Sequence, residues 1–251
     1  LLWSYAFWLL CSLGILRNSP GGALVSLVLV LGLSVWALRS IDLDEFKDWI
    51  RSRQRMIVVS EILFLVAFAG WAVVRAANPE ASGTEKPMEL ALINAIIHSP
   101  AFPPHDPWLS GYAISYYYFG YVMVGLLAVL TNTSAGIAFN LGSALVFGLS
   151  ALGSYGLVYN LLQAYNRSQA LAGKSARIPA IRDALLGPLF LLIVSNLEGF
   201  FHSLHARGLF WRQDGTGAWS SGFWQWLDII DLKDAPVCPP SWVPTNFWWW
   251  W

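Results

Sequence analysis

Long apolar runs separated by short polar segments dominate this chain. Six runs predict membrane-spanning helices, at about residues 2–16, 23–38, 56–76, 115–130, 135–163 and 184–201. The runs are continuous and do not alternate between apolar and polar residues, which argues against a β-barrel. The pattern predicts an all-α fold, a polytopic membrane helix bundle with additional surface helices, placed in the cell membrane as a multi-pass protein.

The polar connections refine this picture. Residues 17–22 and 131–134 are rich in turn-forming residues and predict short links between antiparallel helices. Residues 41–55 alternate apolar and charged positions, as in a helix lying along the headgroups. Their basic residues favour the cytoplasmic side, which would put the 77–114 loop outside. The basic loop 165–183 disagrees, so either helix 135–163 is broken near Gly153 or the charge bias is weak.

Composition supports the membrane assignment and excludes one class of partner. Charged residues make up 12% of the chain, apolar residues 56%, and mean hydropathy is +0.52. An average soluble domain has roughly 25% charged residues. The formal net charge of zero gives no attraction to nucleic acid. We expect one membrane domain over residues 1–251, forming the N-terminal fragment of a longer protein, with the lipid bilayer as its partner.

The 77–114 loop holds the densest group of candidate site residues. Glu85 and Glu89 are four residues apart, so on a helix they share a face. Two such carboxylates could hold a divalent cation or act as a base and a neutral acid. They could equally be solvated loop charges, with Lys86 paired to a neighbour. Residues 91–97 predict a short apolar helix resting on the membrane surface.

The segment that follows favours a site over solvated charges. In His105-Asp106-Pro107-Trp108, proline restricts the backbone and tryptophan can anchor it at the membrane interface. The run Tyr116-Tyr117-Tyr118 has two interpretations. It is either an aromatic belt at the mouth of a helix or a hydroxyl-bearing wall that stacks a sugar or a lipid headgroup.

Several motifs together resemble the uncharacterised YYY membrane-protein family, named for its tyrosine run. The resemblance covers nearly the whole chain. It rests on EKPM at 85–88, PPHDPWLSG at 103–111 and YYYFGY at 116–121, with further matches at 60–61, 71–75, 140–141, 196–199 and 240–251.

This family is similar in fold to the GT-C glycosyltransferases, which take a sugar from a polyprenyl-phosphate carrier. The resemblance implies a membrane glycosyltransferase in which Asp106 or Glu85 deprotonates an acceptor hydroxyl or binds Mg or Mn. Asp106-Pro107-Trp108 also resembles the DPW-like motif of oligosaccharyltransferase catalytic subunits, although the helices before the loop depart from the simplest such topology. The residues predicted to bind substrate are Arg75, Lys86, Glu89, His105, Trp108, Tyr116, Tyr117, Tyr118 and Glu198.

Other residues leave a second function class open. Glu61 and Glu198 lie near the ends of predicted spans, and with Glu85 they could instead line the pathway of a transporter or channel. His202 and His205 could share a metal, but an HxxH pair without a third ligand favours interfacial histidines. Residues 202–251 predict a Trp-rich loop, of which residues 210–251 have too many Gly and Pro residues to span and predict an interfacial lid.

Overall fold

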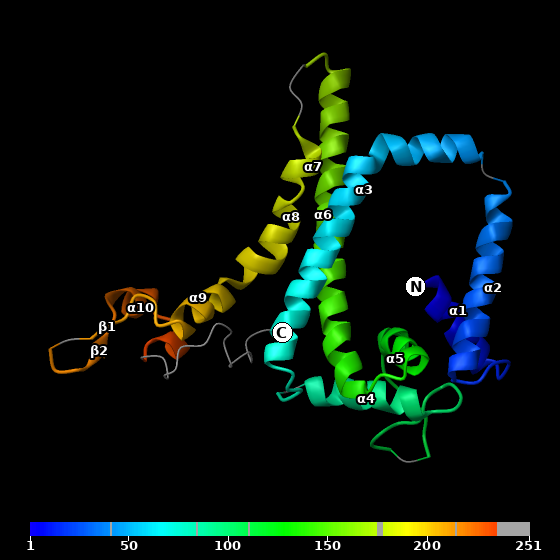
Figure 1. Cartoon of the computed structure of the whole chain (residues 1–251), viewed down its shortest axis with the longest axis horizontal. Coiled ribbons are helices and arrows are strands. Elements are labelled where there is room, and N and C mark those ends of the chain that lie inside the picture. The colour runs from blue at the N-terminus through cyan, green and yellow to red at the C-terminus, as the bar shows by residue number, and fades with distance from the viewer. Residues whose placement is uncertain (41, 84, 110, 175–177, 214, 235–251) are drawn as a thin grey trace. The chain divides into compact units, whose positions relative to one another are not determined.

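The structure, a computed structural model, describes residues 1–40, 42–83, 85–109, 111–174, 178–213 and 215–234, without the side chains of residues 196, 198 and 231. The chain is almost entirely helical (Figure 1). The sequence predicts one membrane domain, and the structure divides the chain into two compact units. Unit 1 comprises Leu1–Val58 and Pro79–Val146, and unit 2 comprises Val59–Asn78 and Phe147–Trp251.

Four helices lie entirely within unit 1, which also includes parts of two longer helices described below. They are α1 (Leu2–Ser12), α2 (Pro20–Leu38), α4 (Lys86–His98) and α5 (Phe119–Thr131). Helix α2 begins where the sequence predicts a turn: Ser19 accepts a hydrogen bond from the amide of Gly22, and Pro20 occupies the first turn, where its missing amide has no cost. Helices α1, α2 and α5 pack on one another, and α4 packs on α5.

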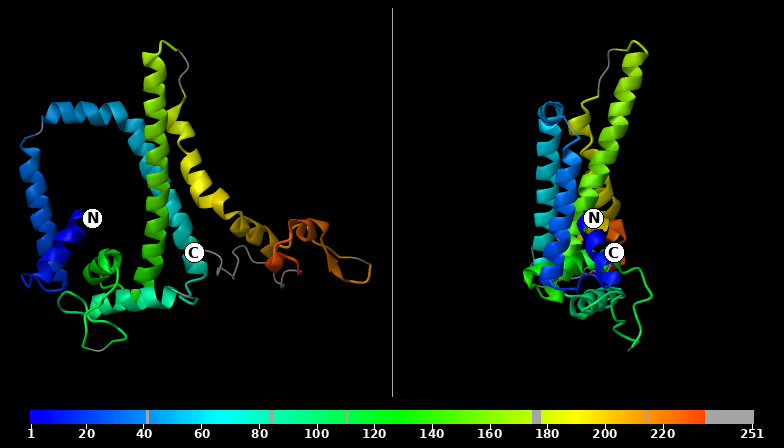
Figure 2. Two further views of the ribbon diagram at one scale, coloured as in Figure 1. Left: turned by 180° about the vertical axis from the view of Figure 1, so that it is seen from behind. Right: turned by 90° about the vertical axis from the view of Figure 1, so that its right-hand side faces the viewer.

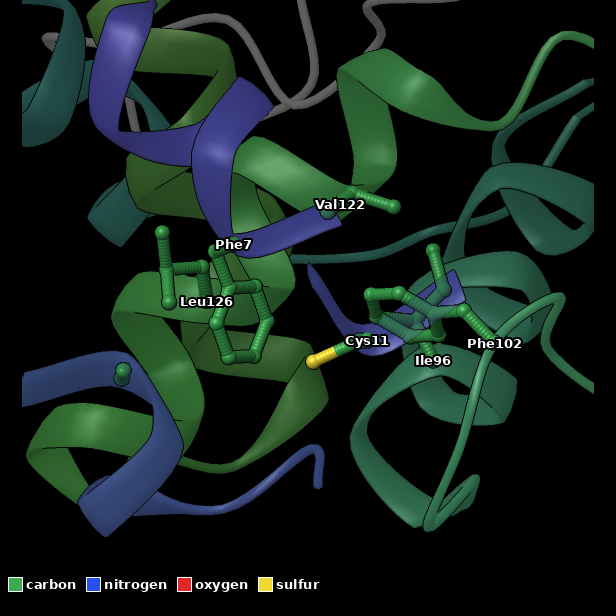
Figure 3. Close-up of a cluster of buried hydrophobic side chains, with 7 residues drawn as sticks. Phe7, Cys11, Ile96, Phe102, Val122 and Leu126 are labelled. Atoms are coloured by element: carbon green, nitrogen blue, oxygen red, sulfur yellow. The ribbon is translucent and has the colours of Figure 1, made fainter. Parts of the chain in front are cut away.

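The core of unit 1 is a cluster of side chains from four helices and a loop (Figure 3). Its main members are Phe7 and Cys11 of α1, Ile96 of α4, Phe102 of the following loop, and Val122 and Leu126 of α5. Gly125 lets α5 approach α4 closely, because a Cβ there would lie 2.7 Å from Ile96 Cγ2. The thiol of Cys11 is buried in this cluster. The cluster fixes α4, which carries the candidate site, against α1 and α5.

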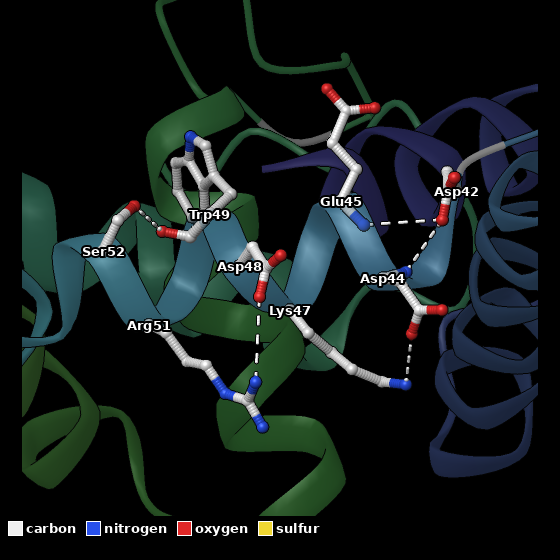
Figure 4. Close-up of polar contacts among 8 residues, drawn as sticks. All are labelled: Asp42, Asp44, Glu45, Lys47, Asp48, Trp49, Arg51 and Ser52. Atoms are coloured by element: carbon white, nitrogen blue, oxygen red, sulfur yellow. Dashed lines mark hydrogen bonds and ion pairs between the residues drawn. The ribbon is translucent and has the colours of Figure 1, made fainter.

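Helix α3 (Leu43–Ala77) joins the predicted surface helix and the predicted third span without interruption. Its first turns expose acidic and basic side chains in local pairs, Lys47 with Asp44 and Arg51 with Asp48, while Asp42 accepts hydrogen bonds from two amides of the first turn (Figure 4). Phe46 stacks on Trp49. This mixture of exposed charges and aromatic rings confirms the amphipathic character expected for residues 41–55 within the described part.

In unit 2, the C-terminal half of α3 packs against α6 (Ala135–Leu171), of which residues from 147 onward belong to this unit. Trp71 stacks on Phe147 with ring centroids 4.4 Å apart, and a Cβ at Gly148 would lie 3.0 Å from the ring of Phe64. Helix α6 continues through Gly153 without a break. The first explanation for the orientation conflict, a hidden break there, is therefore wrong.

The predicted span 184–201 is not one regular helix. Helix α7 (Ala180–Asp183) ends just before this segment, which consists of α8 (Leu186–Pro188), the π-helical turn η1 (Leu189–Ile193), the 3₁₀ turn η2 (Val194–Asn196) and the first half of α9 (Leu197–Ala206). Pro188 has no amide proton to continue an α-helical ladder, and π-turns typically mark such interruptions. Gly187 packs so closely on α6 that a Cβ would lie 2.6 Å from the backbone oxygen of Ser154.

Short elements follow α9. The strands β1 (Arg212–Gln213) and β2 (Trp219–Ser220) form a hairpin, α10 spans Gly222–Leu227, and the 3₁₀ turn η3 spans Ile230–Leu232 (Figure 2). No helix of spanning length occurs in the described residues 202–234, as the sequence predicts for this segment. The predicted lid also includes residues 235–251, which lie outside the described residues.

The prediction of six spans needs correction. Among the described residues, three helices are long and apolar enough to cross a membrane: α2, α3 and α6. The predicted spans 2–16 and 115–130 are α1, with 11 residues, and α5, with 13. At about 1.5 Å per residue these helices reach only about 17 and 20 Å, against an apolar bilayer thickness of about 30 Å. The apolar runs in the sequence are longer than the helices that they form.

Candidate functional site at the end of helix α4

The candidate site lies where α4 ends and the chain turns back. The chain turns back on itself here, with residues 104–106 alongside residues 112–114: His105 pairs with Ala113 in an antiparallel bridge, and the amide of Asp106 donates to Tyr112 O at 2.9 Å. The amide of His105 donates to Ser99 Oγ at 2.9 Å, which ties this turn to the end of α4. A backbone held by several hydrogen bonds keeps the side chains of the turn in defined positions.

A second segment closes the same end of α4. The side-chain amide Nδ2 of Asn18, in the link between α1 and α2, donates to Ile96 O at 2.6 Å and Ser99 O at 2.7 Å, and its backbone amide donates to Pro100 O. The last carbonyls of a helix have no partner within the helix, so an external donor there stabilises the end. Asn18 therefore acts as a clasp between the first link of the chain and the candidate site.

An open depression of about 310 Å³ separates α4 from the turn. Its polar lining residues are Asn94, His98 and Ser99 on the α4 side and His105 and Asp106 on the turn. The sequence predicts a role for His105 and Asp106 but singles out neither Asn94 nor His98 as a site residue. These two are four positions apart and share a face of α4, a spacing that could have indicated them.

Asp106 is the carboxylate of this depression, and its orientation is fixed. Its Oδ1 accepts hydrogen bonds from the amides of Trp108 and Leu109, at 2.8 and 2.9 Å, which closes the turn around Pro107. This arrangement occupies one carboxylate oxygen. Oδ2 accepts no hydrogen bond from any of the described residues. One oxygen of Asp106 thus holds the turn, and the other is not used in it.

The other predicted catalytic acid, Glu85, lies at the opposite end of α4. It occupies the N-cap position, is exposed, and makes no capping hydrogen bond. Helix α4 has 13 residues, so its ends are about 20 Å apart. Lys86 and Glu89 belong to the same N-terminal end, and Tyr121 Oη donates to Glu89 at a long 3.4 Å. The structure therefore places the predicted site residues in two groups rather than one.

The two ends of α4 also differ in electrostatics. The N-terminus of a helix carries partial positive charge and the C-terminus partial negative charge. Lys86 adds to the positive end, while Asp106 lies at the negative end. Near Asp106, hydroxyl donors and cations are favoured over phosphate. A phosphate group held by Lys86 would lie about 20 Å from the carboxylate of Asp106.

The aromatic residues divide in a similar way. Tyr117 is 87% exposed and Tyr116 50%, with their rings edge to face at 5.3 Å. Tyr118 instead accepts a hydrogen bond from Trp8 Nε1 at 3.0 Å, which fastens the start of α5 to α1. Trp108 is 62% exposed beside the turn. Two tyrosines and a tryptophan can thus offer ring faces to a ligand, and the third tyrosine is part of the packing.

The remaining predicted residues belong to unit 2. Arg75 is buried near the end of α3. The side chain of Glu198, in α9, lies outside the described part of the structure. The pair His202 and His205 lies on α9, where His202 is buried and the ring of His205 packs on Trp211 and Trp224. His205 thus takes part in aromatic packing, and the interfacial position expected for this pair stays a prediction.

The predicted metal ligands Asp106 and Glu85 lie far apart. Within the described residues, no three His, Cys, Asp or Glu side chains come close enough together to hold a metal ion. Divalent Mg or Mn prefers several oxygen ligands, and Asp106 and Glu85 lie at opposite ends of α4. The described donors do not fit such an ion, so no chemical step below depends on one, and the ion stays a prediction.

Comparison of the sequence with protein-family models identifies the family of this chain. Residues 2–251 match the family described as "Uncharacterized membrane protein (DUF2298)". The chain belongs to this family. The match covers both units and agrees with the three spanning-length helices, so this DUF2298 chain is a helical membrane protein. No curated protein and no solved structure matched the chain.

Proposed function

We propose that this DUF2298 protein is a membrane glycosyltransferase that transfers a sugar from a polyprenyl-phosphate carrier, with Asp106 as its general base. One observation carries the proposal: Asp106 lines an open polar depression with one carboxylate oxygen fixed by two amides and the other available. The resemblance of the 103–111 and 116–121 motifs to those of the YYY family, and its likeness to GT-C enzymes, supplies the reaction class.

In the proposed reaction, Asp106 Oδ2 takes the proton of an acceptor hydroxyl bound in the depression. The acceptor oxygen then forms a bond to the anomeric carbon of the sugar, and the bond from that carbon to the carrier phosphate breaks. The polyprenyl phosphate leaves with the electron pair of the broken bond. A correctly placed general base of this kind typically contributes about 10²–10⁴-fold in rate.

The other residues have separate roles in this proposal. His98, His105 and Asn94 offer hydrogen bonds that orient the acceptor, and Trp108, Tyr116 and Tyr117 offer ring faces on which a sugar can stack. The negative helix end suits the acceptor hydroxyl and not the carrier phosphate. The phosphate therefore needs a cation from outside the depression. Lys86, at the far end of α4, does not meet that need in this structure.

The test uses the purified membrane protein in lipid with a radiolabelled polyprenyl-phosphate sugar and a mixture of hydroxyl acceptors. Asp106→Asn is the informative variant, because an amide oxygen can still accept the hydrogen bonds from residues 108 and 109 and keep the turn. We expect transfer to fall at least about 10²-fold. Glu85→Gln, at the opposite end of α4, is the matched control and should keep transfer if Asp106 acts alone.

Two results would contradict the proposal. Transfer at the wild-type rate in Asp106→Asn would remove this carboxylate from the reaction. Loss of transfer in Glu85→Gln with full transfer in Asp106→Asn would move the chemistry to the N-terminal end of α4, where the sequence equally predicts an acid.

A transporter remains the second candidate because of Glu61. This carboxylate is exposed on α3, within the apolar stretch that makes α3 long enough to span. An ionisable group within a span typically costs about 2.5–3.5 kcal/mol at the bilayer centre and usually marks a pathway or a paired site. Proton or ion flux into liposomes that is lost in Glu61→Gln, while Asp106→Asn keeps it, would favour transport over transfer.

A further inference from the structure

Residues 200–234 of unit 2, which we call the aromatic cap, form a small packed unit around Trp224. This side chain is fully buried, and its Nε1 donates to Leu209 O at 2.9 Å. The rings of Phe201, His205 and Phe223 surround it, with centroids 6.4, 5.2 and 4.9 Å away. His205 Nε2 also lies 2.7 Å from Asp234 O, which ties the last described residues to α9.

Among the described residues of the aromatic cap, six large apolar side chains are exposed, and Trp226 and Ile230 are the two most exposed of them. Trp226 is 78% exposed and Ile230 is 81% exposed. Helix α10 places Trp224 inward and Trp226 outward, because residues two apart on a helix face different directions. Trp226 keeps one tilted ring contact with the cap, to Phe223 at a centroid distance of 6.4 Å, and most of its surface stays exposed. These two side chains therefore need an apolar environment from elsewhere.

The bilayer is the apolar phase that this chain already contacts. The aromatic cap begins after η2 and the first residues of α9, beyond the apolar turns α8 and η1 (residues 186–193), and Gly187 of α8 packs on the spanning-length helix α6. A chain that runs out along a spanning helix reaches the membrane surface. Tryptophan prefers that region, where its ring is in contact with lipid and its N–H is in contact with water.

The charge of the cap indicates how it would bind. In the sequence, residues 200–234 contain three basic residues, Arg207, Arg212 and Lys233, against four aspartates. Lys233 is moreover paired with Asp228. A net charge of about −1 gives no attraction to anionic headgroups, so electrostatics does not hold this unit on the membrane. Apolar insertion is the interaction that remains.

We propose that the aromatic cap docks on the lipid headgroup region of the bilayer that the chain spans, by inserting Trp226 and Ile230. The inserted side chains hold the cap against the membrane surface independently of anionic lipid. This inference rests on the membrane family and on the packing of unit 2, and it does not depend on the proposed transferase activity.

The experiment places an environment-sensitive fluorophore at the two exposed positions. Trp226→Cys and Ile230→Cys are made separately in a Cys11→Ser, Cys238→Ser background, labelled with NBD and reconstituted in phosphatidylcholine nanodiscs. Both positions are exposed, so neither substitution removes a core side chain. Lys174→Cys, in the exposed polar segment after α6, is the matched control. Quenching is measured with phosphatidylcholine brominated near the glycerol end of its chains and with aqueous iodide.

We expect the fluorophore at 226 or 230 to be quenched at least twofold more by brominated lipid than the control at 174, and to be shielded from iodide. Adding phosphatidylserine should leave this quenching unchanged. Iodide quenching at both 226 and 230 equal to that at 174 would show that these positions face water and would overturn the proposal. Shielding of positions 226 and 230 from both iodide and brominated lipid would also overturn the proposal, because a protein surface would then cover these positions.

Discussion

Trp8 donates a hydrogen bond from its indole Nε1 to the hydroxyl of Tyr118, 3.0 Å away and 110 residues later in the chain. The last residue of the tyrosine run is thereby joined to the first helix. Tyr116 and Tyr117, its two neighbours, remain largely exposed. The two interpretations of the run, packing and ligand binding, therefore apply to different residues of the same motif.

Removal of single hydroxyl groups separates these roles. Tyr118→Phe loses the acceptor for Trp8 and should lower the free energy of unfolding by about 1 kcal/mol, the usual net value of one such hydrogen bond. Tyr117→Phe, at an exposed position, should leave stability unchanged. The measurement is the apparent Tm of both variants in the same detergent. Equal Tm values for Tyr118→Phe and wild type would show that the Trp8 contact contributes nothing.

The Asn18 clasp gives a second prediction. Asn18→Ala removes both side-chain hydrogen bonds to the end of α4 and should destabilise unit 1 by about 1–3 kcal/mol. Asn18→Asp should be worse, because a carboxylate would face the carbonyl oxygens of Ile96 and Ser99 without a proton to donate. Asn160→Ala, on an exposed position of α6, is the control. Apparent Tm checks all three, and an unchanged Tm in both Asn18 variants would contradict the clasp.

Two glycines of unit 2, Gly187 and Gly153, should respond to alanine substitution with opposite changes in stability. Gly187→Ala would place a Cβ 2.6 Å from Ser154 O, so α8 and α6 would have to move apart, at a cost of about 1–3 kcal/mol. Gly153→Ala meets no atom within 4 Å and lies inside α6. Alanine is the better helix former there and should stabilise by about 0.5–1 kcal/mol. Thermal unfolding of the two variants should shift in opposite directions, and a shared sign would contradict the close approach of α8 to α6.

Much of the helical fold could be predicted from the sequence, because apolar runs and turn residues are local signals. The turn before α2, the surface character of residues 42–55 and the short helix α4 all follow from neighbouring residues. The length of spans was less predictable. Residues 184–201 are apolar throughout most of their length, yet Gly187 and Pro188 divide them by packing closely on α6 and by removing an amide proton.

The candidate site illustrates the same limit. The cluster of His105, Asp106 and Trp108 could be predicted because proline and acidic residues are adjacent in sequence. The distance between Glu85 and Asp106 depends on the length of α4 and on the direction in which the chain turns back after it. No pattern in the sequence indicates that direction. The contact of Asn18 with Ser99 joins residues 81 positions apart, so no local pattern could indicate it.

The turn at residues 105–113 yields the last prediction, which is independent of any activity. Asp106→Ala removes the oxygen that accepts hydrogen bonds from the amides of Trp108 and Leu109, whereas the side-chain amide of Asp106→Asn keeps an oxygen that can accept both. Loss of this acceptor loosens the turn without touching the core, so Asp106→Ala should be cleaved by chymotrypsin after Trp108 or Tyr112 several-fold faster than wild type, and Asp106→Asn at nearly the wild-type rate. Glu85→Ala, which removes no capping bond, should also match wild type. Equal cleavage of the alanine and asparagine variants would mean that Asp106 does not hold the turn, and the fixed orientation on which its proposed role depends would be lost.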